Sequence, residues 1–155
     1  MNASERADLI ARYKEGARVV DDSLAGASQE ELDRLPPGGW SARMVAHHLA
    51  DSETNSYLRL RRLLAEDDPQ LQGYDEAEFA RVLHYDRPIE HSLDVFRAVR
   101  ASSAELLDRL TEADWARAGT HGESGRYSVE DWLRIYSGHA EGHADQIRRA
   151  RAGQE

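Results

Sequence analysis

The chain has 155 residues, and because domains commonly contain about 100–200 residues, we expect one domain over residues 1–155. Its 29 acidic and 20 basic side chains give a formal net charge of −9, which argues against general binding to nucleic acid, since phosphate backbones attract basic surfaces. Cysteine is absent, which excludes disulfides, thiolate metal ligands and a cysteine nucleophile, so any thiol that reacts here belongs to another molecule.

The first half of the chain predicts two long helices. Apolar residues at helical spacing extend over residues 4–24, with Ser4 as a candidate N-cap. A second series extends over residues 41–66, and the hydroxyl of Ser41 can cap its start. Two prolines and two glycines at residues 36–39 break the backbone between the two helices.

The second half predicts two further long helices, over residues 89–110 and over residues 129–151 after the candidate cap Ser128. Short helical turns are expected in three connections: residues 28–35, 75–82 and 111–114. The glycine-rich segment 119–127 is expected to be a loop. No strand pattern of comparable length competes, so the sequence predicts an all-α four-helix bundle with short helical turns in the connecting loops. Those loops could cover one end of the bundle or allow crossover connections.

The chain contains no predicted membrane or secretion signal. Residues 1–6 lack the apolar core of a signal peptide, and no stretch approaches the roughly 20 apolar residues that span a bilayer. Its 40% hydrophobic and 32% charged residues are typical of a globular protein. We therefore expect a cytoplasmic protein with neither a membrane nor a nucleic acid as its partner.

Four of the seven histidines form two groups, one on the second and one on the fourth predicted helix. His139 and His143 lie one helical turn apart on a stripe that is otherwise apolar or aromatic. Two buried imidazoles need partners for their ring nitrogens, and one divalent metal ion meets both needs. On the second helix, His48 lies on the face that should point inward and His47 about 100° away, which favours His48 without excluding His47.

Other interpretations of these histidines stay open on spacing alone. Histidines four residues apart also occur as hydrogen-bonded core residues that bind no metal. The zinc-protease motif is absent, because it requires glutamate directly after the first histidine, whereas Glu141 comes two residues after His139. The phosphate-binding glycine motifs and the G-x-S-x-G motif of serine hydrolases are also missing.

Two segments of the sequence resemble the signatures of the DinB/YfiT-like superfamily. Trp40-Ser41 followed by Val45–Glu53 resembles its second-helix signature, and Tyr136–Ile147 resembles its fourth-helix signature. Asn55-Ser56-Tyr57 and Gly73–Glu76 resemble the YfiT branch in particular. The resemblance extends over most of the chain, and the two helix signatures occur in the order that the superfamily requires.

This resemblance implies a four-helix bundle that binds one divalent metal ion through three histidines. The second-helix ligand of the superfamily is the histidine directly before Leu-Ala-Asp, so the ligands carried over to this sequence are His48, His139 and His143. Members of the superfamily are described as metal-dependent hydrolases, and relatives include S-transferases for bacillithiol or mycothiol and a thiol-dependent isomerase. The resemblance also implies a homodimer.

Three neutral imidazoles leave a divalent ion with open coordination positions, which is typical of catalytic sites. Imidazole suits zinc, nickel, iron and copper, and of these we expect zinc or nickel. We therefore expect an enzyme that transfers a low-molecular-weight thiol to a small electrophile. The alternatives are a hydrolase that uses metal-bound hydroxide and a non-catalytic bundle that the metal stabilises.

No catalytic side chain is assigned by the sequence, but a few polar residues are candidates for the pocket. They are Asp51, Glu53, Tyr57 and Tyr136, although acidic residues on helices most often belong to solvated surfaces. Because imidazole must be neutral to bind metal and has a reference pKa near 6.5, metal affinity is expected to fall below about pH 6.

Overall fold

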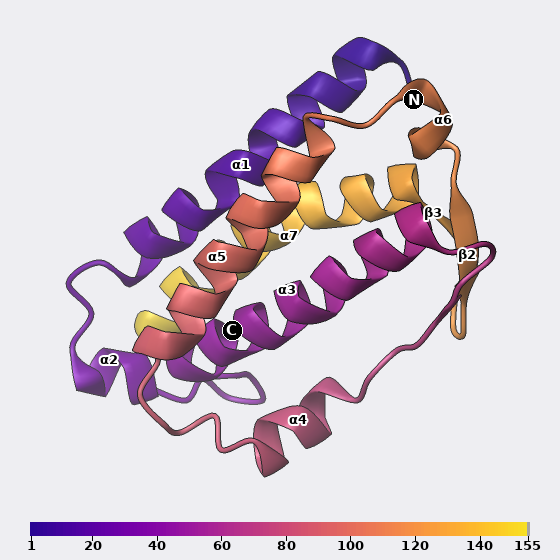
Figure 1. The fold of residues 1–155 in the computed structure, drawn as a ribbon. Helices are drawn as coiled ribbons and strands as arrows, with labels where there is room; N and C mark the ends of the chain where they lie inside the picture. The colour runs from indigo at the N-terminus through magenta and orange to yellow at the C-terminus, as the bar shows by residue number, and fades with distance from the viewer. Residues whose placement is uncertain (155) are drawn as a thin grey trace.

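Four long helices pack as a bundle in the computed structural model, which describes residues 1–154 (Figure 1). They are α1 (Ala3–Leu24), α3 (Ala42–Ala65), α5 (Glu90–Leu107) and α7 (Val129–Arg151). Three short helices lie in the connections: α2 (Gln29–Asp33), α4 (Glu76–Val82) and α6 (Glu112–Trp115). The all-α four-helix bundle predicted from the sequence is confirmed. Within the described residues, no helix is long and apolar enough to cross a membrane.

Three short strands form a small sheet: β1 (Gln70–Leu71), β2 (Ala118–His121) and β3 (Gly125–Ser128). Strands β2 and β3 pair antiparallel, with Ala118 opposite Ser128, and β1 pairs in parallel with β2. The glycine-rich segment expected to be a loop is therefore a β-hairpin, whose turn ends at Gly125 with a φ of 75°. Strands of two and four residues are too short to show the alternation that predicts a sheet.

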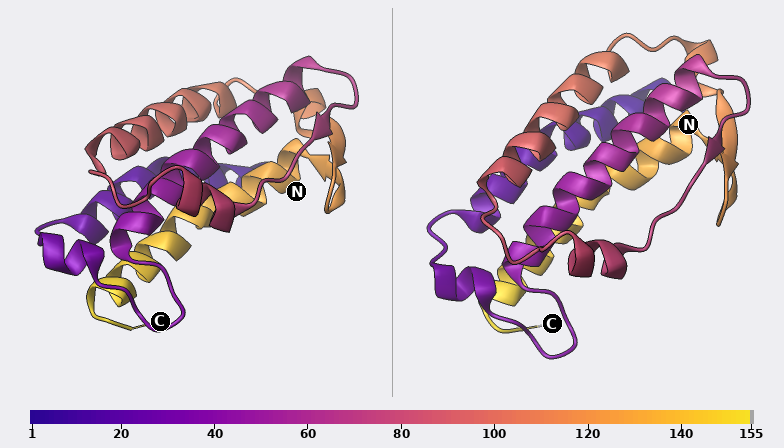
Figure 2. Two further views of the ribbon diagram at one scale, coloured as in Figure 1. Left: turned by 90° about the horizontal axis from the view of Figure 1, so that it is seen from below. Right: turned by 60° about the horizontal axis from the view of Figure 1, so that its bottom comes forward.

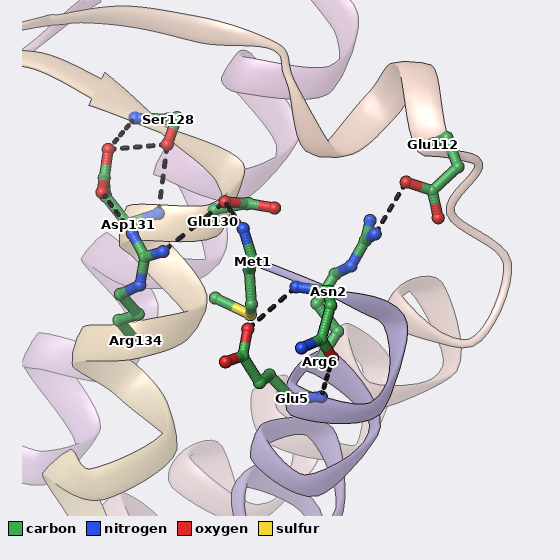
Figure 3. Close-up of polar contacts among 9 residues, drawn as sticks. All are labelled: Met1, Asn2, Glu5, Arg6, Glu112, Ser128, Glu130, Asp131 and Arg134. Carbon is green, nitrogen blue, oxygen red and sulfur yellow. Dashed lines mark hydrogen bonds and ion pairs between the residues drawn. The ribbon is translucent and has the colours of Figure 1, made fainter.

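Side-chain caps start α1, α3 and α7, whereas α5 begins after Ile89 without one. The side chain of Asn2, rather than that of Ser4, caps α1 by accepting a hydrogen bond from the amide of Glu5 at 2.9 Å, and the Glu5 carboxylate accepts one from the Asn2 amide at 2.8 Å. The same reciprocal pair joins Ser128 and Asp131 at the start of α7 (Figure 3). Each pair satisfies two amide groups that the first helical turn leaves free.

The helix directions explain the long connection after α3. The amino group of Met1 lies 3.1 Å from the Glu130 carboxylate, so α1 and α7 begin side by side and run parallel (Figure 3). Helices α3 and α5 are parallel neighbours that run the opposite way (Figures 1 and 2). The chain must therefore return along the bundle between them, and residues 66–89, which we call the crossover segment, do so beside α3 (Figure 2).

A buried polar layer separates two apolar clusters of the core. One cluster surrounds Phe96 and the other surrounds Trp132. Between them, Glu53 of α3 and Arg100 of α5 form an ion pair of 2.9 Å, and the side chains of both are at most 3% exposed. The hydroxyl of Tyr13 on α1 donates to the same Glu53 carboxylate. This layer therefore joins α1, α3 and α5 near the middle of the bundle, and Nη2 of Arg100 extends it to α7 by donating to the carbonyl of Tyr136 at 3.5 Å.

Gly16 on α1 provides a test of this layer, because an added Cβ would lie 2.5 Å from Arg100 Nη2 and 2.7 Å from Ala140 Cβ. We predict that Gly16→Ala lowers the free energy of unfolding by about 1–3 kcal/mol, since the close neighbours must move. Gly142 on α7 is the matched control, because its added Cβ would meet no described atom within 4 Å. Gly142→Ala should stabilise the helix by about 0.5–1 kcal/mol. Urea unfolding measures both changes, and an equal gain in both variants would contradict the packing at Gly16.

Candidate metal centre

Three histidines meet at the seam between α3 and α7. His48 comes from α3, whereas His139 and His143 come from α7, and one ring nitrogen of each lies within 4.8 Å of those of the other two. Nε2 of His139 is 3.2 Å from Nε2 of His143. The His48 ring centroid lies 4.7 Å from that of His143 and 5.8 Å from that of His139. The structure thus brings together the three histidines that the superfamily resemblance selects, and we call them the three-histidine cluster.

The antiparallel contact of α3 with α7 produces this convergence. His48 faces His143 at one level, and one turn further along α3 the Ser52 hydroxyl lies 3.5 Å from Nε2 of His139. A further turn along, the carbonyl of Ser56 accepts a hydrogen bond of 2.9 Å from the indole of Trp132. Residue numbers therefore increase along α3 in the direction in which they decrease along α7, and each turn of one helix contacts one turn of the other.

Burial keeps the three imidazoles neutral at pH 7. Burial, together with the neighbouring His143, lowers the pKa of His48 to about 4. Burial also lowers the pKa of His139 to about 3, with further contributions from the other two histidines and from Arg100. The pKa of His143 is lowered mainly by burial, against the opposing effect of Gln146. The loss of metal affinity expected below about pH 6 therefore moves to lower pH, because neutral imidazole persists there.

The hydrogen bonds of the cluster leave ring nitrogens free for a ligand. Nδ1 of His143 lies 2.8 Å from Oε1 of Gln146, an arrangement in which Nδ1 carries the proton and Nε2 presents its lone pair towards His139. The nitrogen of His139 that faces this lone pair is Nε2, at 3.2 Å, while Nδ1 of His139 and Nδ1 of His48 are buried and have no hydrogen-bond partner among the described residues. Such unpaired nitrogens cost free energy. Three neutral imidazoles with converging nitrogens are a donor set that fits a divalent ion such as zinc.

His47 points away from this cluster. Its Nδ1 lies 2.8 Å from the Ser92 hydroxyl, and its Nε2 lies 3.0 Å from the carbonyl oxygen of Arg87. The ring also packs against that of Tyr85, with centroids 5.3 Å apart. Both ring nitrogens are thus satisfied, and His47 is a core histidine that joins α3 to the crossover segment and to α5. The geometry therefore favours His48 over His47, as the helical face does.

Two of the candidate pocket residues are engaged away from the cluster. Asp51 accepts a hydrogen bond of 2.6 Å from the hydroxyl of Tyr85 in the crossover segment. Tyr57 lies under the guanidinium group of Arg61, whose central carbon is 3.1 Å from the ring centroid. Asp51 therefore stabilises the contact of α3 with the crossover segment, whereas Tyr57 packs against a neighbour one turn further along α3 itself.

The other two candidates lie close to His139 or directly behind it. The ring of Tyr136 is 5.4 Å from that of His139, and its hydroxyl accepts a hydrogen bond of 3.2 Å from Arg59. Glu53 is buried in the polar layer with Arg100, which also contributes to the low pKa of His139. Tyr136 is thus part of the wall of the site, whereas Glu53 stabilises the bundle behind it.

Tyr74 of the crossover segment is a polar group near the cluster that the residue pattern did not reveal. Its hydroxyl oxygen is buried and, within the described residues, makes no hydrogen bond of 3.5 Å or less, although the Ser52 hydroxyl lies close enough to act on its pKa. Burial raises the pKa of Tyr74 to about 12, against the opposing effect of the Ser52 hydroxyl. The only signal in the sequence was its place in the segment Gly73–Glu76, where no helical or strand periodicity predicts which side of the segment faces the core.

Comparisons with known proteins identify the family and the fold of the chain. Residues 12–147 match the family model of the DinB superfamily. A protein of Oceanobacillus iheyensis named "putative metal-dependent hydrolase" is 37% identical over 131 residues, which cover 84% of this chain and 76% of that protein. One of the same name from Geobacillus kaustophilus is 32% identical over 148 residues, covering 94% and 83%. The structure of YfiT from Bacillus subtilis, described as "a probable metal-dependent hydrolase with an unusual four-helix bundle topology", has a TM-score of 0.90 and 26% identity over 100% of this chain and 91% of that one.

The lowered pKa values predict how the metal-free protein responds to acid. Because burial holds the pKa of His48 near 4 and that of His139 near 3, neither ring should gain a proton between pH 8 and pH 5.5. NMR of histidine ring signals, assigned with His48→Gln and His139→Gln variants after chelation of metal, measures this. Signals that titrate with midpoints at or above pH 6.5 would contradict the burial of these imidazoles.

Proposed function

The chain belongs to the DinB superfamily, and from that premise we propose that it is a metal-dependent enzyme whose divalent ion is held by His48, His139 and His143. The observation that carries this proposal is the convergence of three ring nitrogens within 4.8 Å. Burial supports it, since all three rings stay neutral and keep their lone pairs. Zinc or nickel is the ion that we propose, because both accept imidazole ligands.

Residues around the cluster orient the ligands and shield them from water. The amide of Gln146 sets the tautomer of His143, as hydrogen-bonded partners of metal-binding histidines commonly do. The indole of Trp40 packs edge-on against His48 at a centroid distance of 5.4 Å. Tyr136 covers the other side of the cluster at His139. A divalent ion bound there by three protein ligands supplies Lewis acidity that favours the ionised form of a thiol or of water.

Within this class we propose transfer of a low-molecular-weight thiol to a small electrophile. The thiol loses its proton to solvent, its sulfur forms a bond to an electrophilic carbon, and the leaving group departs with the bonding electrons. The two carboxylates of α3 nearest to His48 in sequence are occupied, Asp51 by Tyr85 and Glu53 by Arg100, so neither serves as a general base. A thiol, with a pKa of about 8.5, needs less assistance to ionise than water, at about 15.7.

Hydrolysis is the second candidate, and the names of the relatives from Oceanobacillus and Geobacillus favour it. It would use the same three histidines, with water in place of the thiol as the nucleophile. The two reactions therefore differ in the co-substrate that they need, which makes them separable by experiment.

A matched pair of histidine variants tests the ligand set. Removing a residue that only hydrogen-bonds to a metal ligand commonly weakens metal binding by about 10- to 100-fold. Because His48→Ala removes a ligand itself, we predict that it weakens zinc binding by more than that. His47→Ala should bind zinc with unchanged affinity but lose about 1–3 kcal/mol of stability, because the Ser92 and Arg87 groups lose their partner. Elemental analysis and calorimetric titration measure the first effect, and urea unfolding the second. Equal losses of zinc in both variants would contradict the assignment of His48.

A thiol screen tests the reaction. Zinc-loaded or nickel-loaded protein is incubated with 1-chloro-2,4-dinitrobenzene together with one thiol in each reaction. The thiols are cysteine, glutathione, bacillithiol and mycothiol. We predict a coloured thioether and released chloride with at least one thiol, retained in His47→Ala and lost in His48→Ala. Turnover of ester or amide substrates without any thiol would instead establish the hydrolase. Metal that raises the melting temperature while no substrate turns over would contradict both reactions.

A further inference from the structure

The crossover segment is fixed to α3 at two points near the three-histidine cluster. At the level of the cluster, the hydroxyl of Tyr85 donates a hydrogen bond of 2.6 Å to Asp51. Two turns further along α3, Nη2 of Arg59 donates a hydrogen bond of 2.6 Å to the carbonyl of Gln72. The stretch between these two anchors is therefore held against the bundle, and Tyr74 lies within it.

The hydroxyl of Tyr74 lies over the seam between α3 and α7. Its ring packs against Phe79, with centroids 4.6 Å apart, which fixes the direction of the side chain. The groups that act on its pKa are Ser52 and Asp51 on α3, Tyr136 on α7 and Glu76 in its own segment, so the Tyr74 hydroxyl faces the seam and not the solvent side of the segment. Ser52 and Tyr136 are also the neighbours of His139 on this seam. Tyr74 therefore directs its hydroxyl towards the cluster.

An unpaired donor in this place is costly for the protein alone. Within residues 66–89, all of which the structure describes, Tyr74 is the one residue with a buried side-chain polar atom that lacks a partner. Leaving such a group unpaired costs about 1–3 kcal/mol. The Ser56 hydroxyl, on the same seam, is also buried without a partner in the described structure. By contrast, the Tyr85 hydroxyl of the same segment is satisfied by Asp51.

We propose, on the basis of the function proposed above, that Tyr74 is a ligand-binding residue whose hydroxyl donates a hydrogen bond to an anionic atom of the small molecule held at the three-histidine cluster. The ligand class is a thiolate or another small anion, because the phenol has a proton to donate, the three imidazoles are neutral, and neither nearby carboxylate accepts that proton: Asp51 is engaged by Tyr85, and Glu76 makes no hydrogen bond to Tyr74. A neutral ligand without an acceptor atom would leave the hydroxyl unpaired and would gain nothing from it.

The test uses cobalt(II)-loaded protein and 2-mercaptoethanol as the probe, with the dissociation constant taken from the change in visible absorption. Tyr74→Phe removes one oxygen and keeps the packing against Phe79. We expect about tenfold weaker binding of the probe, unchanged cobalt affinity, and a melting temperature equal to or above that of the wild type. Tyr85→Phe is the matched control: it loses a satisfied hydrogen bond, so its melting temperature should fall, while probe binding stays within twofold because the Arg59–Gln72 hydrogen bond and the packing on Phe79 still hold Tyr74.

Each result decides for or against the role of Tyr74. Equal probe affinity in the wild type and Tyr74→Phe would overturn it, as would failure of the cobalt-loaded wild type to bind the probe. A fall in melting temperature as large as that of Tyr85→Phe would show that the protein itself satisfies the Tyr74 hydroxyl, and would also overturn it. Absence of cobalt binding by the wild type would overturn the proposed function and this role together, whereas cobalt binding with an inert Tyr74→Phe would overturn the role of Tyr74 alone.

Discussion

The antiparallel register of α3 against α7 is the constraint on which the site depends, because it alone places His48 opposite His143. A slip of one turn would move His48 by about 5.4 Å along the seam and separate the three rings. The buried pair of Glu53 and Arg100 opposes such a slip, since Glu53 belongs to α3 and Arg100 also approaches the carbonyl of Tyr136 on α7 at 3.5 Å. Breaking a buried ion pair by removing one partner commonly costs about 3–5 kcal/mol.

Burial keeps the imidazoles of the site neutral, and it also leaves polar groups there unpaired at a cost in folding free energy. The same exclusion of water that keeps the imidazoles neutral leaves Nδ1 of His48 and His139 without described partners, together with the hydroxyl of Tyr74. In a core selected only for stability, such groups would be paired or replaced by apolar ones. These three groups lie along one seam between the two apolar clusters, which supports the proposal that this part of the bundle holds a ligand.

The parts of the structure that depend on local pattern were predictable, and those that depend on distant partners were not. Apolar spacing and the caps at Ser41 and Ser128 predicted the long helices, and the inward face of the second helix favoured His48. An acidic residue on a helix, such as Glu53, is expected at the surface. Glu53 is buried because it pairs with Arg100, which lies 47 residues away in the sequence. The hairpin and the position of Tyr74 likewise rest on pairing and packing across the bundle, for which a single sequence carries no periodic signal.

X-ray absorption spectroscopy of the zinc-loaded protein tests the central claim, the convergence of three imidazoles on one ion, most directly. Three nitrogen ligands at about 2.0–2.1 Å, with the outer scattering typical of imidazole rings, are expected for the wild type. His48→Ala should show two such rings. A ligand shell without imidazole scattering, or an unchanged number of imidazoles in His48→Ala, would contradict the convergence of His48, His139 and His143 on one ion.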